Sequence, residues 1–219
     1  MPRFIDLSHP IEEGMVTYPG LPAPHICDFW SRASTAGRYA PGVTFQIGRI
    51  DMVANTGTYL DAPFHRYAAG TDIAGLALSS LAELEGVCVR VPEGMRRIDA
   101  SFFSGLVLRR RAVLVATGWD RFWNTPHYGE GHPFLTRDAA ALLSDAEVAL
   151  VGIDSLNIDD SADPERPVHS ILLGAGIPIV EHLAGLGALP PSGFTFSAVP
   201  APVRGMGSFP VRAYARLPD

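Results

Sequence analysis

Two segments of the chain combine side chains that can bind a metal ion or transfer protons. The first, Asn55 to His65, contains Tyr59 and Asp61 together with hydroxyl groups, and a glycine and a proline interrupt any regular strand there. Irregular backbone of this kind often presents ligating and catalytic groups. An aspartate and a histidine four residues apart also occur as a capping aspartate and a surface histidine, so this segment alone leaves both roles open.

The second segment follows more than a hundred residues later and contains His169 and Glu181. Glu181 comes directly after an apolar run, at the expected end of a strand. Its carboxylate is then either exposed or recruited by a cation, because burying it unpaired would cost several kcal/mol. The spacing does not decide between a metal ligand and a structural residue.

The elements that must position these groups are mostly short strands. Alternating or β-branched apolar residues between turn signals predict strands at 4–7, 44–54, 87–91, 112–117, 148–153, 177–180, 194–199 and 211–215. The apolar phase of the second strand changes at Gly48 and Arg49, which predicts a bulge there. Helices are expected at 73–84 and at 137–143, the latter with Thr136 as its N-cap.

The strands at 112–117 and 148–153, with the helix at 137–143 between them, are typical of a βαβ unit. Polar residues just after the strand ends of such units tend to line the ligand crevice. We therefore expect the segments 117–120 and 154–157 near a binding site. Tyr18 and Trp119 are candidates for the walls of a substrate pocket, with core packing as the alternative role for each.

The composition fits one globular domain spanning residues 1–219. Hydrophobic residues make up 47% of the chain and charged residues 18%, a balance that can form a substantial core. The formal net charge of −6 leaves no excess of cations to neutralise phosphates, which argues against a nucleic-acid partner. No segment resembles a secretion signal or reaches the roughly 18 apolar residues of a membrane span, so we expect a cytoplasmic protein without a membrane partner.

The segment 55–65 resembles the H-x-G-T-H-x-D-x-P-x-H signature of the cyclase family, which includes bacterial kynurenine formamidase and isatin hydrolase. The matching residues are Gly57, Thr58, Asp61, Pro63 and His65. Further likeness lies in the D-L-S at 6–8, the M-x-x-Y-P-G pattern at 15–20, the later His169 and Glu181, and the closing segment with Gly207 and 210–213. The resemblance covers nearly the whole chain in the right order.

This resemblance implies an α/β fold, a mixed-sheet swivelling β/α/β barrel-like domain, in a homodimer or larger homo-oligomer. It also implies zinc or manganese bound as one or two ions, and hydrolysis of an amide or lactam C–N bond. By matched position, Asp61, His169 and Glu181 would be metal ligands and His65 the acid/base residue. Such roles agree with the chemistry of carboxylate and imidazole ligands.

The chain departs from the signature at its first two histidines, which are Asn55 and Tyr59 here. Amide oxygen is a poor substitute for imidazole, and a phenol must lose its proton before it binds a metal well. Three outcomes are open: one ion held by Asp61, His169 and Glu181; a shifted site that uses Asn55 or Tyr59; or a pocket without metal. We favour one ion.

The function expected from these residues is hydrolysis of a small amide or cyclic amide. Metal-bound water would attack the carbonyl carbon, and His65 would transfer a proton to the leaving nitrogen. One alternative is a ring-forming cyclase or dehydratase in which Tyr59 and His65 transfer protons; Tyr59 could also stabilise an oxyanion. Another is a non-catalytic protein that binds a small molecule on the same scaffold.

Overall fold

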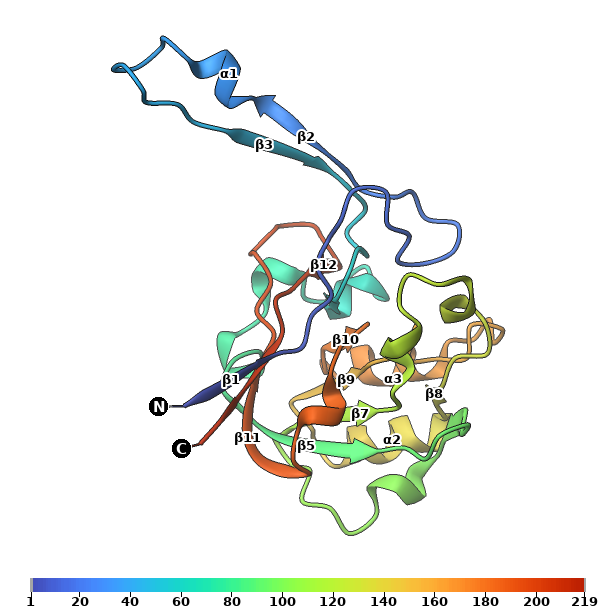
Figure 1. Ribbon diagram of the computed structural model, residues 1–219. Helices are drawn as coiled ribbons and strands as arrows, with labels where there is room; N and C mark the ends of the chain where they lie inside the picture. Colours follow the sequence, from blue (N-terminus) through green and yellow to red (C-terminus); the bar gives the residue numbers. More distant parts are fainter. Residues whose placement is uncertain (1, 219) are drawn as a thin grey trace.

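A nine-stranded mixed sheet dominates the computed structural model, which describes residues 2–218 (Figure 1). The strand order is β1 (Arg3–Asp6), β13 (Tyr214–Leu217), β11 (Ser192–Ser197), β5 (Leu84–Arg90), β7 (Ala112–Ala116), β9 (Leu150–Ile153), β10 (Ile179–Glu181), β4 (Tyr59–Asp61) and β12 (Ser208–Pro210). The four strands from β5 to β10 in this order run parallel, and the strands on either side of them pair antiparallel. The sheet curls into a half-barrel, which confirms the expected fold class.

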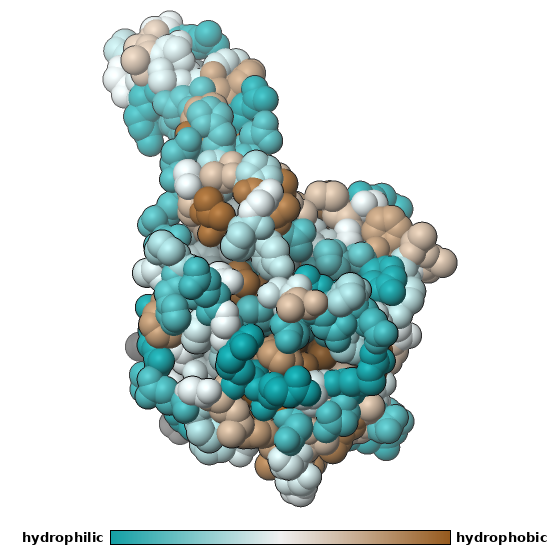
Figure 2. Space-filling view, turned by 90° about the vertical axis from the view of Figure 1, so that its right-hand side faces the viewer, coloured by the Kyte–Doolittle hydropathy of each residue, from teal (hydrophilic) through white to brown (hydrophobic). Residues whose placement is uncertain are grey.

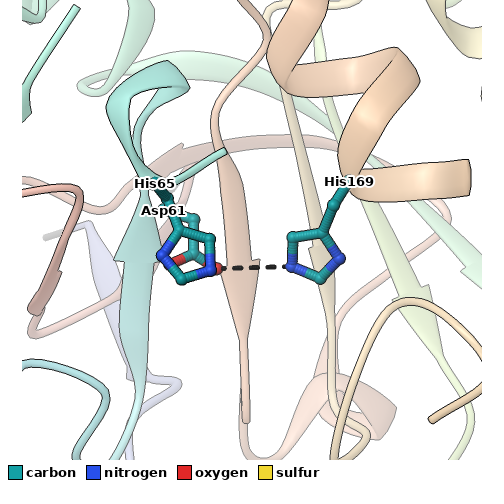
Figure 3. Close-up of side chains that lie close together, drawn as sticks. All are labelled: Asp61, His65 and His169. Carbon is teal, nitrogen blue, oxygen red and sulfur yellow. Dashed lines mark ion pairs between the residues drawn. The ribbon is translucent and has the colours of Figure 1, made fainter. Parts of the chain in front are cut away.

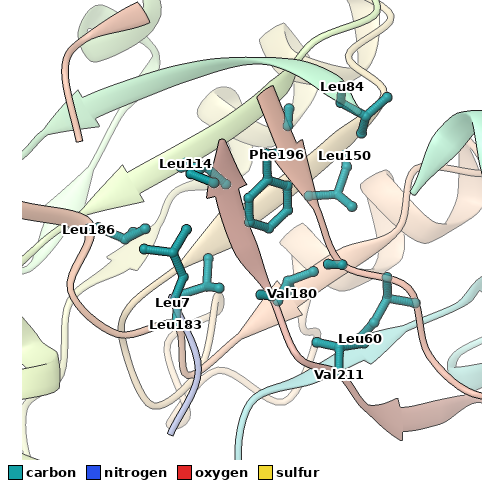
Figure 4. Packing of buried hydrophobic residues seen from close by; sticks show 14 of the residues in the cluster. Leu7, Leu60, Leu84, Leu114, Leu150, Val180, Leu183, Leu186, Phe196 and Val211 are labelled. Atoms are coloured by element: carbon teal, nitrogen blue, oxygen red, sulfur yellow. The ribbon is translucent and has the colours of Figure 1, made fainter. Parts of the chain in front are cut away.

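Apolar side chains cover both faces of the central strands. On β7, Leu114 points into the curl of the sheet, where Leu7, Leu60 and Phe196 pack (Figure 4). Its neighbours in sequence point to the opposite face, which the helices α2 (Arg137–Asp145) and α3 (Pro167–Gly174) cover. Strands that are buried on both faces have almost continuous apolar sequences, as in 112–116.

The predicted βαβ unit is confirmed, because β7 and β9 pair in parallel and α2 lies between them in the chain. Thr136 occupies the N-cap position, although its hydroxyl donates to the carbonyl of Ile98 instead of capping the helix. The predicted helix at 73–84 is wrong. That segment forms two 3₁₀ turns, η2 (Ile73–Gly75) and η3 (Leu78–Ser80), because the Asp72 carboxylate accepts the N–H of Gly75 and closes the first turn.

A hairpin arm projects from the body of the molecule (Figures 1 and 2). It consists of β2 (His25–Trp30), the short helix α1 (Arg32–Thr35) and β3 (Ile47–Asp51), and its two strands pair antiparallel. The strand predicted at 44–54 is therefore shorter than expected. The pairing is irregular near Gly48 as predicted, but the extra residue lies on β2, between Asp28 and Trp30.

Smaller elements connect the main ones. Two short strands, β6 (Arg97–Ile98) and β8 (Phe134–Leu135), form a parallel pair. Further 3₁₀ turns are η1 (Pro63–His65), η4 (Ala100–Phe103), η5 (Trp119–Phe122), η6 (Pro126–Gly129) and η7 (Leu186–Ala188). Within residues 2–218, no helix has the length and apolar character needed to cross a membrane.

Gly207 allows the chain before β12 to lie directly against the turn that carries His65. Its carbonyl accepts the N–H of Ala62 at 2.7 Å. A Cβ atom at residue 207 would lie 2.5 Å from the Cα of His65, a distance at which backbone must move. The side chain of residue 207 therefore limits how closely β12 can approach the candidate site.

We expect Gly207→Ala to lower the free energy of unfolding by about 1–3 kcal/mol, because the added methyl group would overpack the contact with His65. Urea unfolding followed by circular dichroism measures this change. Gly187→Ala is the matched control, since a Cβ there meets nothing within 4 Å. Equal stability of both variants would contradict the steric argument.

Candidate functional site

The register of three strands places polar side chains on one face of the sheet. The central strand, β4, pairs antiparallel with β10 and with β12, so that Tyr59 lies opposite Glu181, and Asp61 lies opposite Ser208. Alternate residues of a strand, and residues directly opposite each other, point to the same face. Leu60 points the other way, into the core. The four polar side chains therefore converge beneath α3.

α3 adds His169 to this group from the side opposite the strands (Figure 3). Asp159 fixes the start of the helix, since its carboxylate accepts the backbone N–H groups of Val168 at 2.7 Å and His169 at 3.0 Å. The same carboxylate lies 2.6 Å from His169 Nδ1. His169 Nε2 then faces Asp61 Oδ2 and Glu181 Oε1, each at 3.7 Å.

Buried charge dominates the electrostatics around His169. Burial raises the pKa of Glu181 to about 7, against the opposing effect of His169. Burial alone would lower the pKa of His169, but its hydrogen bond to Asp159 and the nearby carboxylates of Asp61 and Glu181 outweigh burial and raise the pKa to about 10. Burial would likewise raise the pKa of Asp61, yet its histidine neighbours and Ser208 lower it below the usual range. The cluster thus favours a positive charge at its centre.

An unpartnered oxygen marks the place where a cation fits. Asp61 is fully buried, and its Oδ2 atom has no hydrogen-bond partner among the described residues 2–218. One ligand atom each from Asp61, His65 and His169 lies within 4.8 Å of the others. A carboxylate oxygen with imidazole nitrogens is a donor set suited to zinc or manganese. These residues therefore fit a divalent ion.

Ser208 links the cluster to Asn55. Its hydroxyl donates to Asp61 Oδ1, and its oxygen lies 2.9 Å from His65 Nδ1 and 3.3 Å from Asn55 Nδ2. A hydroxyl has one hydrogen, which goes to Asp61, so His65 must donate from Nδ1 and keeps its free lone pair on Nε2. Ser208 was missed in the sequence, although it lies inside the closing segment that resembles the family.

Tyr59 is bound to Glu181 through its hydroxyl, which donates to Oε2 at 2.7 Å. Burial and the nearby carboxylates of Glu181 and Asp61 raise the pKa of Tyr59 well above its usual value. The phenol therefore stays protonated, and it is better suited to holding Glu181 than to binding a metal as phenolate. The second oxygen of Glu181 accepts the N–H of Ile158 at 2.6 Å.

A cavity of about 440 Å³ opens above the cluster. Its walls include a wider set of residues than the cluster itself: Tyr18, Leu21, Asn55, Tyr59, His65, Arg66, Asn157, Pro164, Glu165, Arg166, His169 and Glu181. Tyr18 thus lies where a substrate-binding residue was expected. Trp119 does not: it lines a separate hollow beside Phe122 and His127, and its indole N–H donates to the carbonyl of Tyr128 at 3.0 Å. The turn after β7 directs the indole to this other cluster of aromatic rings.

A family model described as a putative cyclase matches residues 5–160. The chain belongs to this cyclase family. Kynurenine formamidase of Geobacillus thermodenitrificans is 26% identical over 219 residues, covering 99% of this chain and 98% of the relative. The corresponding enzyme of Bacillus cytotoxicus is 27% identical over 222 residues, with 98% and 97% covered.

Solved structures agree with this cyclase-family membership. A potential metal-dependent hydrolase with cyclase activity superposes with a TM-score of 0.82 at 26% identity, covering 100% of both chains. Isatin hydrolase A from Labrenzia aggregata has the same TM-score at 18% identity, covering 100% of this chain and 94% of that one, which shows a shared fold. The expected family resemblance is thereby confirmed.

Asp159 is a second residue that the sequence did not single out, and it orients His169 in the way that carboxylates commonly orient metal-ligating histidines. We expect Asp159→Asn to weaken Mn²⁺ and Zn²⁺ binding by about 10- to 100-fold, because the ring loses its charged partner. Competition with a chelating dye measures the dissociation constants.

Asp160→Asn is the matched control for this change. Asp160 is the next residue, and its carboxylate accepts the N–H of Ala162 on the exposed side of the loop. The Asp160→Asn variant should bind metal with the same affinity as the parent protein. Unchanged metal affinity in folded Asp159→Asn would contradict the orienting role.

Proposed function

We propose that the protein is a metal-dependent hydrolase that cleaves the C–N bond of a small amide or cyclic amide. The observation that carries this proposal is the unpartnered, fully buried Oδ2 of Asp61, which faces His169, one of the residues that line the cavity. Curated relatives named kynurenine formamidase, similar over nearly their whole length, support the same reaction class.

We propose Asp61, His169 and Glu181 as the ligands of one zinc or manganese ion. The carboxylate oxygens of Asp61 and Glu181 lie at the same 3.7 Å from His169 Nε2. When bound, such an ion polarises a carbonyl oxygen and makes water acidic enough to attack near neutral pH. Asn55, which donates its amide hydrogen to Ser208, supports the site from outside this ligand set.

We assign proton transfer to His65. Its side chain is 37% exposed and lines the cavity, whereas His169 is 8% exposed. Because Ser208 accepts from Nδ1, the Nε2 atom is free to take a proton from the attacking water and to deliver it to the leaving nitrogen. Tyr59 keeps Glu181 in place, since its hydroxyl hydrogen is already donated.

This assignment favours hydrolysis over the ring-forming cyclase or dehydratase. The alternative required Tyr59 to transfer protons, but its hydroxyl is buried and bound to Glu181. A non-catalytic binding protein has no need for a free imidazole nitrogen beside a buried carboxylate cluster.

Protein purified without chelators should contain one equivalent of zinc or manganese, and it should hydrolyse N-formylkynurenine or isatin. Dialysis against a chelator should abolish turnover, and added Mn²⁺ or Zn²⁺ should restore it. Elemental analysis and an absorbance assay measure both quantities. Metal-free protein that hydrolyses neither compound would overturn the proposal.

Two variants separate the ligand from the proton-transfer residue. His65→Ala should keep its metal and lose about 10²- to 10⁴-fold in kcat, since general acid–base catalysis contributes that much. Glu181→Gln should lose the metal together with activity. Loss of metal from His65→Ala would instead make His65 a ligand, in keeping with its place within 4.8 Å of the other two groups.

We further propose that the protein forms a homo-oligomer through its hairpin arm. Large apolar side chains are exposed along the arm, among them Phe29 (62% exposed) and Phe45 (51%). Every residue of β3 is exposed. Large exposed apolar side chains and unpaired strand edges of this kind favour protein contacts over water.

Light scattering coupled to gel filtration tests the arm contact. The parent protein should have a mass at least twice the 23.5 kDa of one chain, and Phe29→Ser combined with Phe45→Ser should shift it toward one chain. Leu78→Ser removes a side chain that is 66% exposed outside the arm and should leave the mass unchanged. A monomeric parent protein would contradict the proposal.

The partner expected at the cavity is a small molecule, in agreement with the net charge of −6 and the cavity volume. The cytoplasmic location stays a prediction. It is consistent with Cys27 and Cys88, which are both free thiols. Cys88 is buried in the core, which raises the pKa of its thiol to about 11 and leaves it unreactive.

A further inference from the structure

Two arginines, Arg66 and Arg166, line the cavity above the candidate metal ligands. They come from different parts of the chain: Arg66 directly follows the turn with His65, and Arg166 immediately precedes α3. Each guanidinium is therefore held a short distance along the backbone from a functional histidine.

Neutral groups orient both side chains. Arg66 Nε donates to Ser170 Oγ at 3.2 Å. Arg166 donates from Nη1 to Asn157 Oδ1 at 3.2 Å and from Nη2 to the carbonyl of Ser161 at 3.3 Å. A guanidinium has five N–H donors, so most of those on Arg66 and several on Arg166 remain available.

The acidic residues around the cavity do not neutralise these arginines. Glu165 also lines the cavity, but it forms an ion pair with Arg137. Among residues 2–218, no carboxylate oxygen lies within 4.0 Å of a nitrogen of Arg66 or Arg166. The cavity therefore has on its walls two guanidinium groups without a carboxylate partner among the described residues, and Glu181 lines it beside the buried Asp61.

We propose that the amide substrate carries a carboxylate, which Arg66 and Arg166 bind at the end remote from the scissile C–N bond; this inference rests on the proposed hydrolase function. Planar guanidinium groups pair with carboxylates through two parallel hydrogen bonds. Asp61 and Glu181 would neutralise the ion proposed between them, whereas no carboxylate in the described part of the chain pairs with Arg66 or Arg166, so the charged end of the substrate should point toward the arginines. The carbonyl group then points toward the proposed ion.

The remaining walls suit a flat apolar body between these two ends. Tyr18, Leu21 and Pro164 line the cavity, and its volume of about 440 Å³ is enough for a single-ring compound. The substrate class is thus a small aryl or alkyl amide with a carboxylate. Neutral lactams such as isatin lack the charged group and should be poorer substrates.

Three formamides that differ at one position test this inference with the metal-loaded protein. They are 4-formamidobenzoate, its uncharged isostere 4-formamidobenzamide, and formanilide. The carboxylate compound should have a kcat/KM about tenfold or more above that of the carboxamide, mainly through KM, because a charged hydrogen bond is lost in the latter. Calorimetric titration with benzoate and benzamide adds a readout that does not depend on turnover.

Two variants locate the effect. Arg66→Gln and Arg166→Gln should each move the carboxylate-to-carboxamide ratio toward one, and they should remove the preference for benzoate. Arg109→Gln makes the same change in charge at a residue that pairs with Glu147 outside the cavity, and it should keep the parent ratio. Either cavity variant suffices if the other does not fold.

The outcomes separate this inference from the proposed function. Equal turnover of all three formamides by the parent protein would overturn the carboxylate preference and leave the hydrolase standing. Hydrolysis of none of them, nor of N-formylkynurenine and isatin, would overturn the hydrolase, while tighter binding of benzoate than of benzamide would still support the anion site. A ratio that both cavity variants leave unchanged would refute the role of the arginines.

Discussion

Three carboxylates buried around one imidazole are the constraint on which the rest of the site depends. Asp61, Asp159 and Glu181 are at most 1% exposed, and all three lie near His169. Carboxylates in such a place are costly unless a positive charge compensates them. The raised pKa of His169 indicates that a proton on its ring can supply part of that positive charge. The Oδ2 atom of Asp61 still has no partner within residues 2–218, so some of the buried negative charge stays uncompensated.

A divalent ion would compensate the negative charge of these carboxylates more fully than the imidazolium does. Binding requires neutral imidazole, so the ion must displace the proton on His169 Nε2 and affinity must depend on pH. Nδ1 keeps its proton, because Asp159 accepts it and also holds the first turn of α3. The same carboxylate thus fixes the helix, the tautomer and the direction of the free nitrogen.

Strand pairing in the sheet fixes the positions of the side chains in the cluster. β4 has three residues, yet it pairs on both sides, and the core side chain of Leu60 anchors it from behind. A shift of one residue in its register would turn Asp61 toward the core and Leu60 toward the cavity. Close approach at Gly207 holds β12 and Ser208 against this strand. Geometry at the site therefore depends on backbone pairing more than on flexible loops.

Sequence patterns predicted the strands that are buried on both faces, because burial on both faces requires continuous apolar runs such as 112–116 and 150–153. They missed α3, whose apolar side chains lie on most of its circumference and leave no polar stripe to reveal a helical period. In the arm, β3 lies within the strand predicted at 44–54, but β2 was missed. The exposure of β3 was also not expected, since alternation in a strand normally implies one buried face.

The candidate site was predictable only where whole motifs carried it. Asp61, His65, His169 and Glu181 matched a known family pattern, and three of them meet within 4.8 Å. Ser208 and Asp159 have no local signal, because their roles come from strand register and from the start of α3. Trp119 lines a different hollow for a related reason: the sequence places it after β7, but the direction of its ring depends on contacts with Phe122 and His127.

The two departures from the family signature change the site in one consistent direction. Tyr59 donates to Glu181 and Asn55 donates to Ser208, so both residues orient acceptors of the cluster instead of offering lone pairs to a metal. The raised pKa of Tyr59 keeps its proton in place. Each substitution therefore removes a ligand and adds a hydrogen-bond donor. The single cation that we propose fits what remains, because a second ion would have to bind beside hydrogen-bond donors that repel it.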